Sequence, residues 1–481
     1  MAPRLTVLGG GVSGLSACFT ASRLQRPALS SLRLVDSGPR PGGWFWSEHD
    51  AQSNITLERG PHSFRPVGPS GASAIRLVEE LGLEHEAVST SSSAKNRYIW
   101  YNNKLRVMPT SIVAMLKDPM TRILPWAGVR EALFVAKGDG HDESVYDFFS
   151  RRFGPYVAET FADPLLQGIF AGDIRRLSVQ ACLPVLAELE AQHGSVVRAM
   201  VGRGLGVFKA QPPKFDVEEV QTPQGRELVK ATGVSFPGGL GRLSEVLVQK
   251  IRDQKDVPCE IRSDTKVMSI SRNGAIGLDS GEVLGMDGAG DKVISALPMR
   301  SLARILPSGT GSRLRKLAEE TPYASVGVVN LAWEGMEKLP VSGFGHLVPT
   351  SQVQCVIGMI YDSEVFPSQF TPTSSGLTVM MGGMQFPEVA RYSEEEMIEL
   401  ALAKVQEHLG ISQTPTIAKA VLHRNCIPQY TLNHKTKVAE AREELGKELP
   451  FLRTIGNNFD GVGIADSIAH ARRAVRELYA K

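Results

Sequence analysis

The sequence predicts an α/β protein whose first domain is a Rossmann-like dinucleotide-binding fold. Residues 5–8 form a short apolar run, and Gly9–Gly14 follows directly and fits G-x-G-x-x-G. Small and apolar residues then recur with helical spacing, and a second apolar run over residues 32–35 ends on Asp36. A strand, a glycine-rich turn, a helix and a strand that ends on an acid together bind a dinucleotide.

Each glycine of this turn has a chemical reason. Gly9 allows the tight turn, Gly11 lets the backbone approach a pyrophosphate, and Gly14 lets the helix pack on the strand. The helix N-terminus faces the phosphates, and Asp36, 22 residues after Gly14, can accept hydrogen bonds from a ribose. The other predicted cofactor residues of the turn are Gly10, Val12 and Ser13. The alternative is a glycine-rich turn that holds no ligand.

The composition is that of a globular protein, and 481 residues are too many for one core, so two or three domains are expected. A net charge of +2 argues against a nucleic-acid partner. The five cysteines include no C-x-x-C and the histidines no H-x-x-x-H, so we expect neither disulfides nor a metal. The early first strand leaves no room for a cleavable targeting segment, and no run of 18 apolar residues predicts a membrane-spanning helix.

A second glycine pair follows Asp36 and favours FAD over NAD. In flavoproteins with two dinucleotide-binding motifs, a similar stretch lies along the FAD diphosphate, and its arginine contacts phosphate. A simple NAD-binding domain does not need it, although a surface turn is an alternative. The predicted cofactor residues of this stretch are Ser37, Arg40, Gly42, Gly43 and Trp44.

A Gly-Pro pair follows the next apolar strand and suits a backbone that passes close to a flat ligand. In flavin amine oxidases and their relatives this segment runs near the isoalloxazine. Gly60, Pro61, His62 and Ser63 are therefore expected at the flavin, although His62 can equally be an ordinary polar loop residue.

Over nearly its whole length the chain resembles the protoporphyrinogen oxidases of animal and fungal mitochondria. Two segments, 343–349 (GFGHLVP) and 425–430 (NCIPQY), are more specific than the nucleotide motifs, which many flavoproteins share. The other segments that carry the resemblance are 9–14, 40–44, 60–61, 95–98 and 168–172. In two places the chain departs from the family. His62 stands where mammalian members have arginine, and Asn433 precedes His434 where glycine is usual. Asparagine tolerates positive φ, so the turn at Asn433 is expected to form.

The resemblance implies an FAD-dependent oxidase that converts protoporphyrinogen IX to protoporphyrin IX in haem biosynthesis. Six electrons and six hydrogens leave the substrate, and molecular oxygen takes up the electrons as three molecules of hydrogen peroxide. Hydride passes from a methylene carbon to flavin N5, so no catalytic side chain is expected. The implied substrate contacts are Arg97, Gly168, Phe344, Leu347, Ile360 and Met380. For Arg97 we expect a bidentate contact with a propionate, and a structural salt bridge is the alternative.

Residues 104–137 combine helical apolar spacing with six basic residues against two acids, a local net charge of +4. Prolines at 109, 119 and 125 predict several short helices. Such a stretch can lie on an anionic bilayer surface or form a helical core with a basic rim. The resemblance favours the membrane surface, specifically peripheral attachment to the mitochondrial inner membrane on its intermembrane-space face. It also makes a homodimer and a contact with ferrochelatase candidate assemblies.

The predicted organisation is discontinuous. Residues 1–94, 233–298 and 442–481 are assigned to the FAD-binding domain, 95–232 to a helical membrane-associating domain that ends in a loop or linker over 202–232, and 299–441 to a substrate domain with a mixed sheet. The last predicted cofactor residues are Val267, Asn457, Val462, Gly463 and Ile464. The backbone of Val267 is expected at the adenine, and the others at a helix N-terminus beside the flavin. Two other classes share these features in part: another flavin amine oxidase or desaturase, and a non-enzymatic carrier such as a GDP-dissociation inhibitor.

Overall fold

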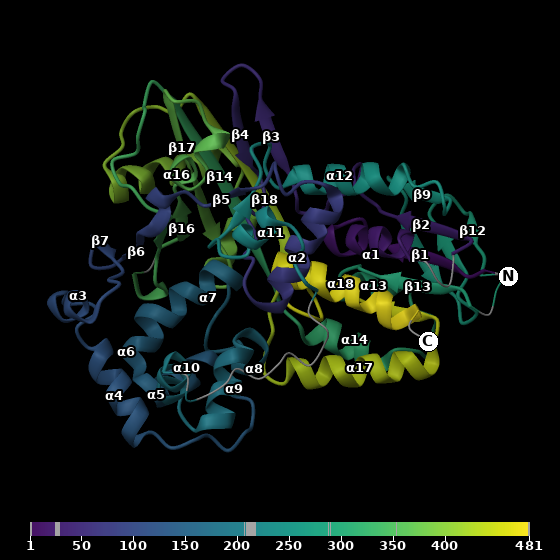
Figure 1. The fold of residues 1–481 in the computed structure, drawn as a ribbon, viewed down its shortest axis with the longest axis horizontal. Coiled ribbons are helices and arrows are strands. Elements are labelled where there is room, and N and C mark those ends of the chain that lie inside the picture. Colours follow the sequence, from purple (N-terminus) through teal and green to yellow (C-terminus); the bar gives the residue numbers. More distant parts are fainter. Residues whose placement is uncertain are drawn as a thin grey trace.

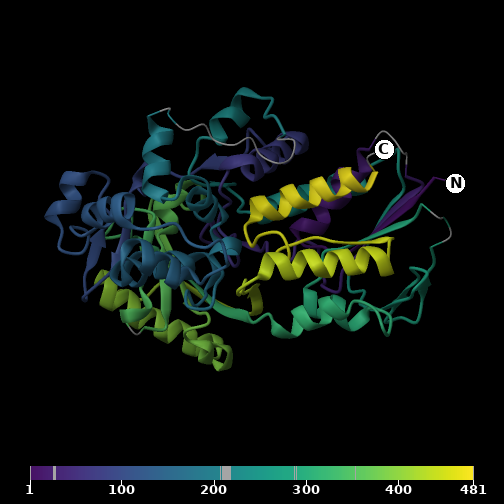
Figure 2. The ribbon, with the colours of Figure 1, turned by 90° about the horizontal axis from the view of Figure 1, so that it is seen from below.

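Two large sheets dominate the molecule, and a cluster of helices lies beside the second sheet (Figure 1). The structure is a computed structural model that describes residues 2–24, 29–205, 207, 218–286, 288, 290–352 and 354–479. The first and last described elements lie at one end of the molecule, and the helices of residues 112–204 lie at the other end (Figure 2).

The first sheet has five strands in the order β19-β13-β1-β2-β9, and every neighbouring pair is parallel. Its strands are β1 (Arg4–Leu8), β2 (Ser31–Val35), β9 (Cys259–Arg262), β13 (Lys292–Ser295) and β19 (Leu452–Thr454). A parallel sheet of this kind is buried on both faces. The predicted Rossmann-like fold, built from discontinuous segments, is therefore confirmed.

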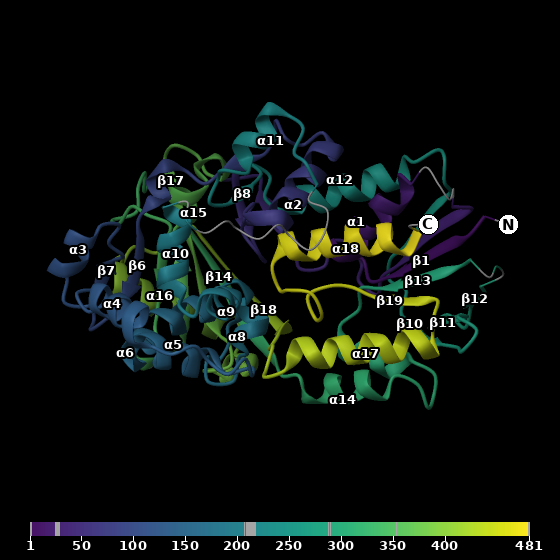
Figure 3. The same ribbon diagram turned by 60° about the horizontal axis from the view of Figure 1, so that its bottom comes forward.

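Helices cover both faces of this parallel sheet (Figure 3). The helices on one face are α1 (Val12–Ser22), α2 (Gly68–Leu81), α12 (Gly241–Arg252) and α18 (Ile464–Tyr479). Those on the other face are α13 (Met299–Ile305), α14 (Ser312–Glu320) and α17 (His434–Glu448), together with the small sheet of β10 (Val267–Ile270), β11 (Ile276–Leu278) and β12 (Val283–Leu284). Leu15 of α1 and Ile468 of α18 are fully buried in the shared core, as the helical spacing predicted.

The second sheet is mixed, as predicted, with the order β18-β14-β17-β16-β15-β6-β7. Only the β15–β6 pair is parallel. The strands are β6 (Arg97–Trp100), β7 (Leu105–Val107), β14 (Tyr323–Glu334), β15 (Gly345–Leu347), β16 (Val356–Ile360), β17 (Ser374–Gly382) and β18 (Ile417–Pro428). Helix α16 (Glu394–Leu409), which begins with a capping box at Ser393, packs on one face against Trp333 and Val379.

Several smaller elements lie outside the two large sheets. They are the hairpin of β3 (Ser47–Asp50) and β4 (Ile55–Glu58), the pair of β5 (Val88–Ser89) and β8 (Val234–Ser235), and the short helix α15 (Asp362–Val365).

The structure differs from the expected helical segment at both of its ends. Residues 105–107 form strand β7, because Asn102 and Asn103 adopt positive φ (50° and 56°) and turn the chain back along β6. The expected loop over 202–232 contains helix α11 (Pro223–Leu228), which Thr222 caps and Pro223 starts. Residues 206 and 208–217 of that predicted loop lie outside the described residues.

Between these ends the segment is helical. It contains α3 (Ile112–Lys117), α4 (Leu124–Phe134), α5 (Val145–Phe153), α6 (Pro155–Val157), a π-helical turn (Ala158–Ala162), α7 (Asp163–Phe170), α8 (Val179–Cys182), α9 (Pro184–His193) and α10 (Val196–Gly204). Across the described residues, none of the helices has both the length and the apolar character needed to cross a membrane.

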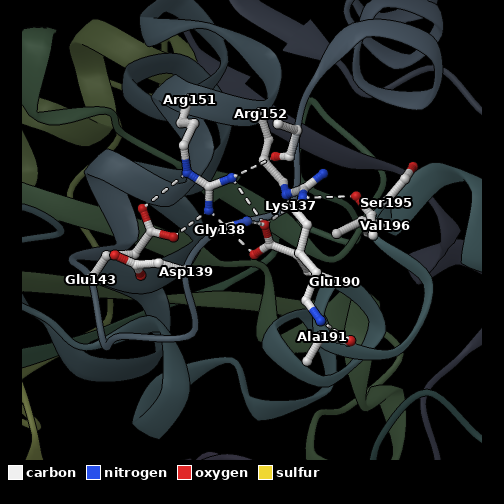
Figure 4. A network of polar contacts seen from close by, with 12 residues as sticks. Lys137, Gly138, Asp139, Glu143, Arg151, Arg152, Glu190, Ala191, Ser195 and Val196 are labelled. Carbon is white, nitrogen blue, oxygen red and sulfur yellow. Dashed lines mark hydrogen bonds and ion pairs between the residues drawn. The ribbon is translucent and has the colours of Figure 1, made fainter.

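A network of buried ion pairs holds these helices together (Figure 4). Arg152 of α5 is fully buried and pairs with Glu190 of α9 and with Glu131 of α4. Glu131 also accepts hydrogen bonds from the Ser195 hydroxyl and from the N–H of Val196 at 2.9 Å. Burial alone would raise the pKa of Glu131, but these hydrogen bonds and Arg152 lower it below its usual value. Because a buried charge needs partners, the network fixes α4 against α5, α9 and α10.

Because of these contacts, the charged side of α4 is buried and its apolar side faces solvent. Its buried side is marked by the carboxylate of Glu131, and its exposed side is apolar: Trp126 is 67% exposed, Leu133 68% and Phe134 79%. Exposed apolar residues also cover α3, where Ile112 and Val113 lie open to solvent. These exposed apolar side chains of α3 and α4, called the exposed apolar face below, are candidates for an interaction surface.

Candidate active site

The glycine-rich turn leaves open space in front of Gly11. A Cβ atom added there would meet no atom within 4 Å, whereas a Cβ on Gly14 would lie 1.8 Å from the carbonyl oxygen of Gly9. Gly14 is therefore required by helix–strand packing, and Gly11 borders a space that a phosphate can enter. Val12 and Ser13 begin α1, so their backbone N–H groups line the same space.

Asp36 follows β2 and is hydrogen-bonded to the glycine-rich turn. Its carboxylate accepts hydrogen bonds from the N–H groups of Gly10 at 2.6 Å and of Gly38 at 2.8 Å. Its backbone carbonyl accepts a hydrogen bond from the N–H of Thr265 at 2.9 Å. This contact brings Val267, at the start of β10, close to the turn. Each carboxylate oxygen keeps a second lone pair, which a ribose hydroxyl can use. Ser37 follows at the exposed edge.

The second glycine pair packs directly on the first turn. The N–H of Gly42 donates to the carbonyl of Gly10 at 2.7 Å, and a Cβ on Gly43 would lie 3.0 Å from the Cα of Gly11. Arg40 donates from Nη1 to the carbonyl of Phe45 at 2.7 Å, so its other N–H groups remain available to a phosphate.

The Gly60–Ser63 segment packs against the second glycine pair and Trp44. A Cβ on Gly60 would lie 2.0 Å from the carbonyl oxygen of Trp44, so only glycine allows this approach. His62 is 9% exposed, unlike an ordinary polar loop residue, and its Nδ1 pairs with Asp362 at 2.9 Å. Burial lowers the pKa of His62, but the carboxylates of Asp362 and Glu58 outweigh it and raise the pKa above its usual value. Burial raises the pKa of Glu58 to about 7.

The Cys426–Tyr430 segment holds the C-terminal loop that leads into α18. The Tyr430 hydroxyl donates to the carbonyl of Asn457 and accepts from the N–H of Gly461 at 2.9 Å. The ring of Tyr430 stacks on His434, with ring centres 4.0 Å apart, and Nε2 of His434 contacts the carbonyl of Asn458 at 3.1 Å. Asn433 has φ 62°, which confirms the turn expected there.

This anchored loop approaches the start of α1. A Cβ on Gly456 would lie 3.7 Å from the Ser13 hydroxyl, so the beginning of this loop lies beside the start of α1. Val462 and Gly463 precede α18, and Ile464 begins it. The anchoring role of Tyr430 and His434 was missed in the sequence, because nothing in the local pattern connects residue 430 with residue 461.

The second sheet brings most of the predicted substrate residues together. The guanidinium carbon of Arg97 lies 5.4 Å from the centre of the Phe344 ring, and Gly345 pairs with both Arg97 and Ile360. Phe344 and Ile360 pack in one cluster. A Cβ on Gly168 would lie 3.0 Å from Leu347, so α7 covers the same strands.

Met380 lies slightly apart from this group. It is half-buried on β17 opposite Gly358 and packs against Ala171, Val328 and Ile357. Gln429 holds the C-terminal end of α7 nearby, through a hydrogen bond from its Nε2 to the carbonyl of Phe170 at 2.8 Å.

Comparison with known proteins agrees with this geometry. Residues 12–479 match the family described as flavin containing amine oxidoreductase. The chain is 34% identical to the protoporphyrinogen oxidase of Homo sapiens, over 98% of each chain. The chain belongs to the protoporphyrinogen oxidase family. It is also 27% identical to the coproporphyrinogen III oxidase of Bacillus subtilis (strain 168), over 98% of this chain and 97% of that one.

Among solved structures, a protein from Exiguobacterium sp. 255-15 that is provisionally named a protoporphyrinogen oxidase aligns with a TM-score of 0.80. It is 22% identical and covers 100% of this chain and 99% of its own, which shows the shared fold. As a member of the protoporphyrinogen oxidase family, the chain is an FAD-dependent oxidoreductase. The open space before Gly11, at the start of α1 and beside a second glycine pair, fits this cofactor.

Proposed function

We propose that this protein oxidises protoporphyrinogen IX to protoporphyrin IX, with molecular oxygen as the final electron acceptor. The observation that carries the proposal is the position of the Arg97 guanidinium over the Phe344 ring, beside Ile360. Protoporphyrinogen is an apolar macrocycle with two propionates on one edge. A cation beside an apolar wall complements that shape and charge.

Bound FAD supplies the two-electron acceptor for each oxidation step. The protein's own contribution is binding and orientation. Arg97 holds a propionate through two parallel N–H donors and thereby sets which methylene carbon faces the flavin. Phe344, Leu347 and Ile360 cover the macrocycle and exclude water, with Gly168 and Met380 completing the wall. Each step also releases one proton from a pyrrole N–H of the substrate to solvent, and one proton is taken up as oxygen is reduced to hydrogen peroxide, so the step balances without a side-chain base.

We assign the cofactor to the residues around the open space before Gly11. The backbone N–H groups of Gly11, Val12 and Ser13 would hold the diphosphate, with Arg40, Gly42 and Gly43 beside it. Gly9, Gly10 and Gly14 shape the turn. Asp36 and Ser37 lie at the ribose and Val267 at the adenine. Trp44, Gly60–Ser63, Asn457 and Val462–Ile464 border the flavin ring.

We also propose that α3 and α4 attach the protein to a membrane surface, peripherally and on the intermembrane-space face of the mitochondrial inner membrane. The exposed side chains of Trp126, Leu133 and Phe134, in a segment with local charge +4, support contact with a membrane surface. Aromatic and aliphatic side chains with basic neighbours bind the interface of anionic bilayers.

Aerobic turnover tests the substrate assignment. The purified, flavin-loaded protein is mixed with protoporphyrinogen IX, coproporphyrinogen III or a primary amine, and porphyrin fluorescence and peroxide are followed. We expect protoporphyrin with three molecules of peroxide per molecule of product. A preference for coproporphyrinogen III, or oxidation of the amine alone, contradicts the assignment.

Vesicle co-sedimentation tests the membrane assignment. We expect the triple variant Trp126→Ser, Leu133→Ser, Phe134→Ser to lose binding to anionic vesicles but to keep its activity in detergent. A matched control replaces three exposed apolar residues of the first domain, Val67, Met268 and Val283, with serine. Equal binding by both triple variants contradicts the assignment.

A further inference from the structure

A groove of about 750 Å³ opens at the edge of the exposed apolar face. It lies between the turn of the β6–β7 hairpin and the connection from α3 to α4. The residues that matter below are Tyr101, Arg106, Leu116, Arg122, Ile123 and Trp126. Along β6, Tyr101 of the groove lies four residues from Arg97, about 13 Å at roughly 3.3 Å per residue. Arg106 is nearer, because it pairs with Ile99, two residues from Arg97.

Two arginines reach this groove without strong partners. The Nε of Arg106 is buried and has no hydrogen-bond partner, and its nearest acid, Asp118, is 3.9 Å from Nη1. Asp118 is already engaged, because its Oδ1 accepts from the N–H groups of Met120 at 2.8 Å and Thr121 at 3.3 Å. The side chain of Arg122 is exposed and forms no hydrogen bond or ion pair with any residue that the structure describes. Both guanidinium groups can therefore serve an outside anion.

The other walls of the groove are apolar and lead outward. Leu116 is 49% exposed, Ile123 45% and Trp126 67%. These side chains continue into the apolar face of α3 and α4 that is proposed to contact the membrane. A ligand that fills the groove must therefore join an anionic group, at the arginines, to an apolar chain, along Leu116, Ile123 and Trp126.

We propose that this groove binds a single anionic phospholipid, with Arg106 and Arg122 at the headgroup phosphate and one acyl chain along Leu116, Ile123 and Trp126. A phosphodiester accepts parallel N–H donors from guanidinium groups. A free inorganic anion would use the arginines but not the apolar wall. This site rests on the membrane attachment proposed above and adds specificity to it. The groove would bind an anionic phospholipid, whereas the apolar face alone would bind any bilayer.

Binding of a short-chain phosphatidylglycerol below its critical micelle concentration tests the site, because a monomer presents no bilayer and no surface potential. Trp126 fluorescence reports binding, and Trp126→Phe identifies that signal. We expect Arg106→Gln/Arg122→Gln to weaken binding about tenfold or more. The matched control, Lys104→Gln/Lys117→Gln, removes the same charge from exposed residues beside the groove and is expected to weaken binding less than about threefold. Activity in detergent is expected to stay unchanged in both variants, which shows that they fold.

Three results overturn the site. The arginine variant can bind the lipid as the parent does, the lysine control can lose as much as the arginine variant, or glycerol phosphate can bind as tightly as the lipid. The first two results would show that lipid binding does not depend specifically on Arg106 and Arg122. The third would show that the groove binds small anions without using its apolar wall. Co-sedimentation of the arginine variant with vesicles of neutral phosphatidylcholine separates this site from membrane attachment: retained binding there leaves attachment standing even where the lipid site fails.

Discussion

Replacing Gly11 with valine tests the cofactor site without disturbing the fold. Gly11 has φ −69° and ψ 178°, which any residue adopts, and an added Cβ meets no atom within 4 Å. The side chain would instead fill the space assigned to the FAD diphosphate. We expect affinity for FAD to fall by at least about a hundredfold, which corresponds to about 2.8 kcal/mol. Gly14→Ala is the contrasting variant, because its Cβ would lie 1.8 Å from the Gly9 carbonyl oxygen and must displace backbone, at about 3 kcal/mol of folding free energy.

The assay measures two quantities for each variant: the flavin-to-protein ratio after purification and the free energy of unfolding of the cofactor-free protein. The second must be measured without FAD, since a ligand that binds only the folded state adds to apparent stability. Gly11→Val should lose flavin and keep its unfolding free energy, whereas Gly14→Ala should lose stability. Full flavin content in Gly11→Val would refute the assignment of this space to the diphosphate.

Three further predictions concern Arg97, the buried pair of His346 and His408, and Glu131. Arg97→Ala should lower kcat/KM for protoporphyrinogen about tenfold or more at normal flavin content, with Arg97→Lys recovering only part; full activity of the alanine variant would make the residue structural. Burial lowers the pKa of His408 to about 4 and that of its hydrogen-bonded neighbour His346 well below its usual value. The folded protein therefore binds fewer protons than the unfolded chain, and its unfolding free energy should fall as the pH drops from about 6.5 toward 4; urea titrations at several pH values measure this slope, which His408→Gln should reduce. Glu131→Ala leaves Arg152 buried with a partner missing and should cost about 3–5 kcal/mol in urea unfolding, whereas Glu143→Ala, at a partly exposed ion pair, should cost less than about 1 kcal/mol.

The first domain could be predicted because its signals are local. The turn Gly9–Gly14 and Asp36 lie within one strand–turn–helix–strand unit, and each residue type has a reason within that unit. The positive φ of Asn433 could be predicted for the same reason, since few side chains tolerate that conformation.

The remaining features depend on pairs that are distant in the chain. His62 is buried because Asp362, 300 residues later, pairs with it. Glu131 faces inward on α4 because its carboxylate pairs with Arg152 and accepts a hydrogen bond from the Ser195 hydroxyl. The apolar spacing of α4 alone suggests the opposite orientation of this helix. Strand β7 was expected to be helical because the spacing of Leu105 and Val107 fits both a helix and a strand. The turn at Asn102 and Asn103, which have positive φ, makes this segment a strand.

Anaerobic mixing of the flavin-loaded protein with protoporphyrinogen IX tests the central claim most directly, because it separates electron transfer into the flavin from every later event. We predict that the visible absorption of the oxidised flavin bleaches on mixing, that porphyrin absorption rises as oxygen is admitted, and that Arg97→Ala slows the bleaching while binding flavin normally. A flavin that stays oxidised in the presence of protoporphyrinogen, in a protein that is fully loaded and folded, would contradict the claim.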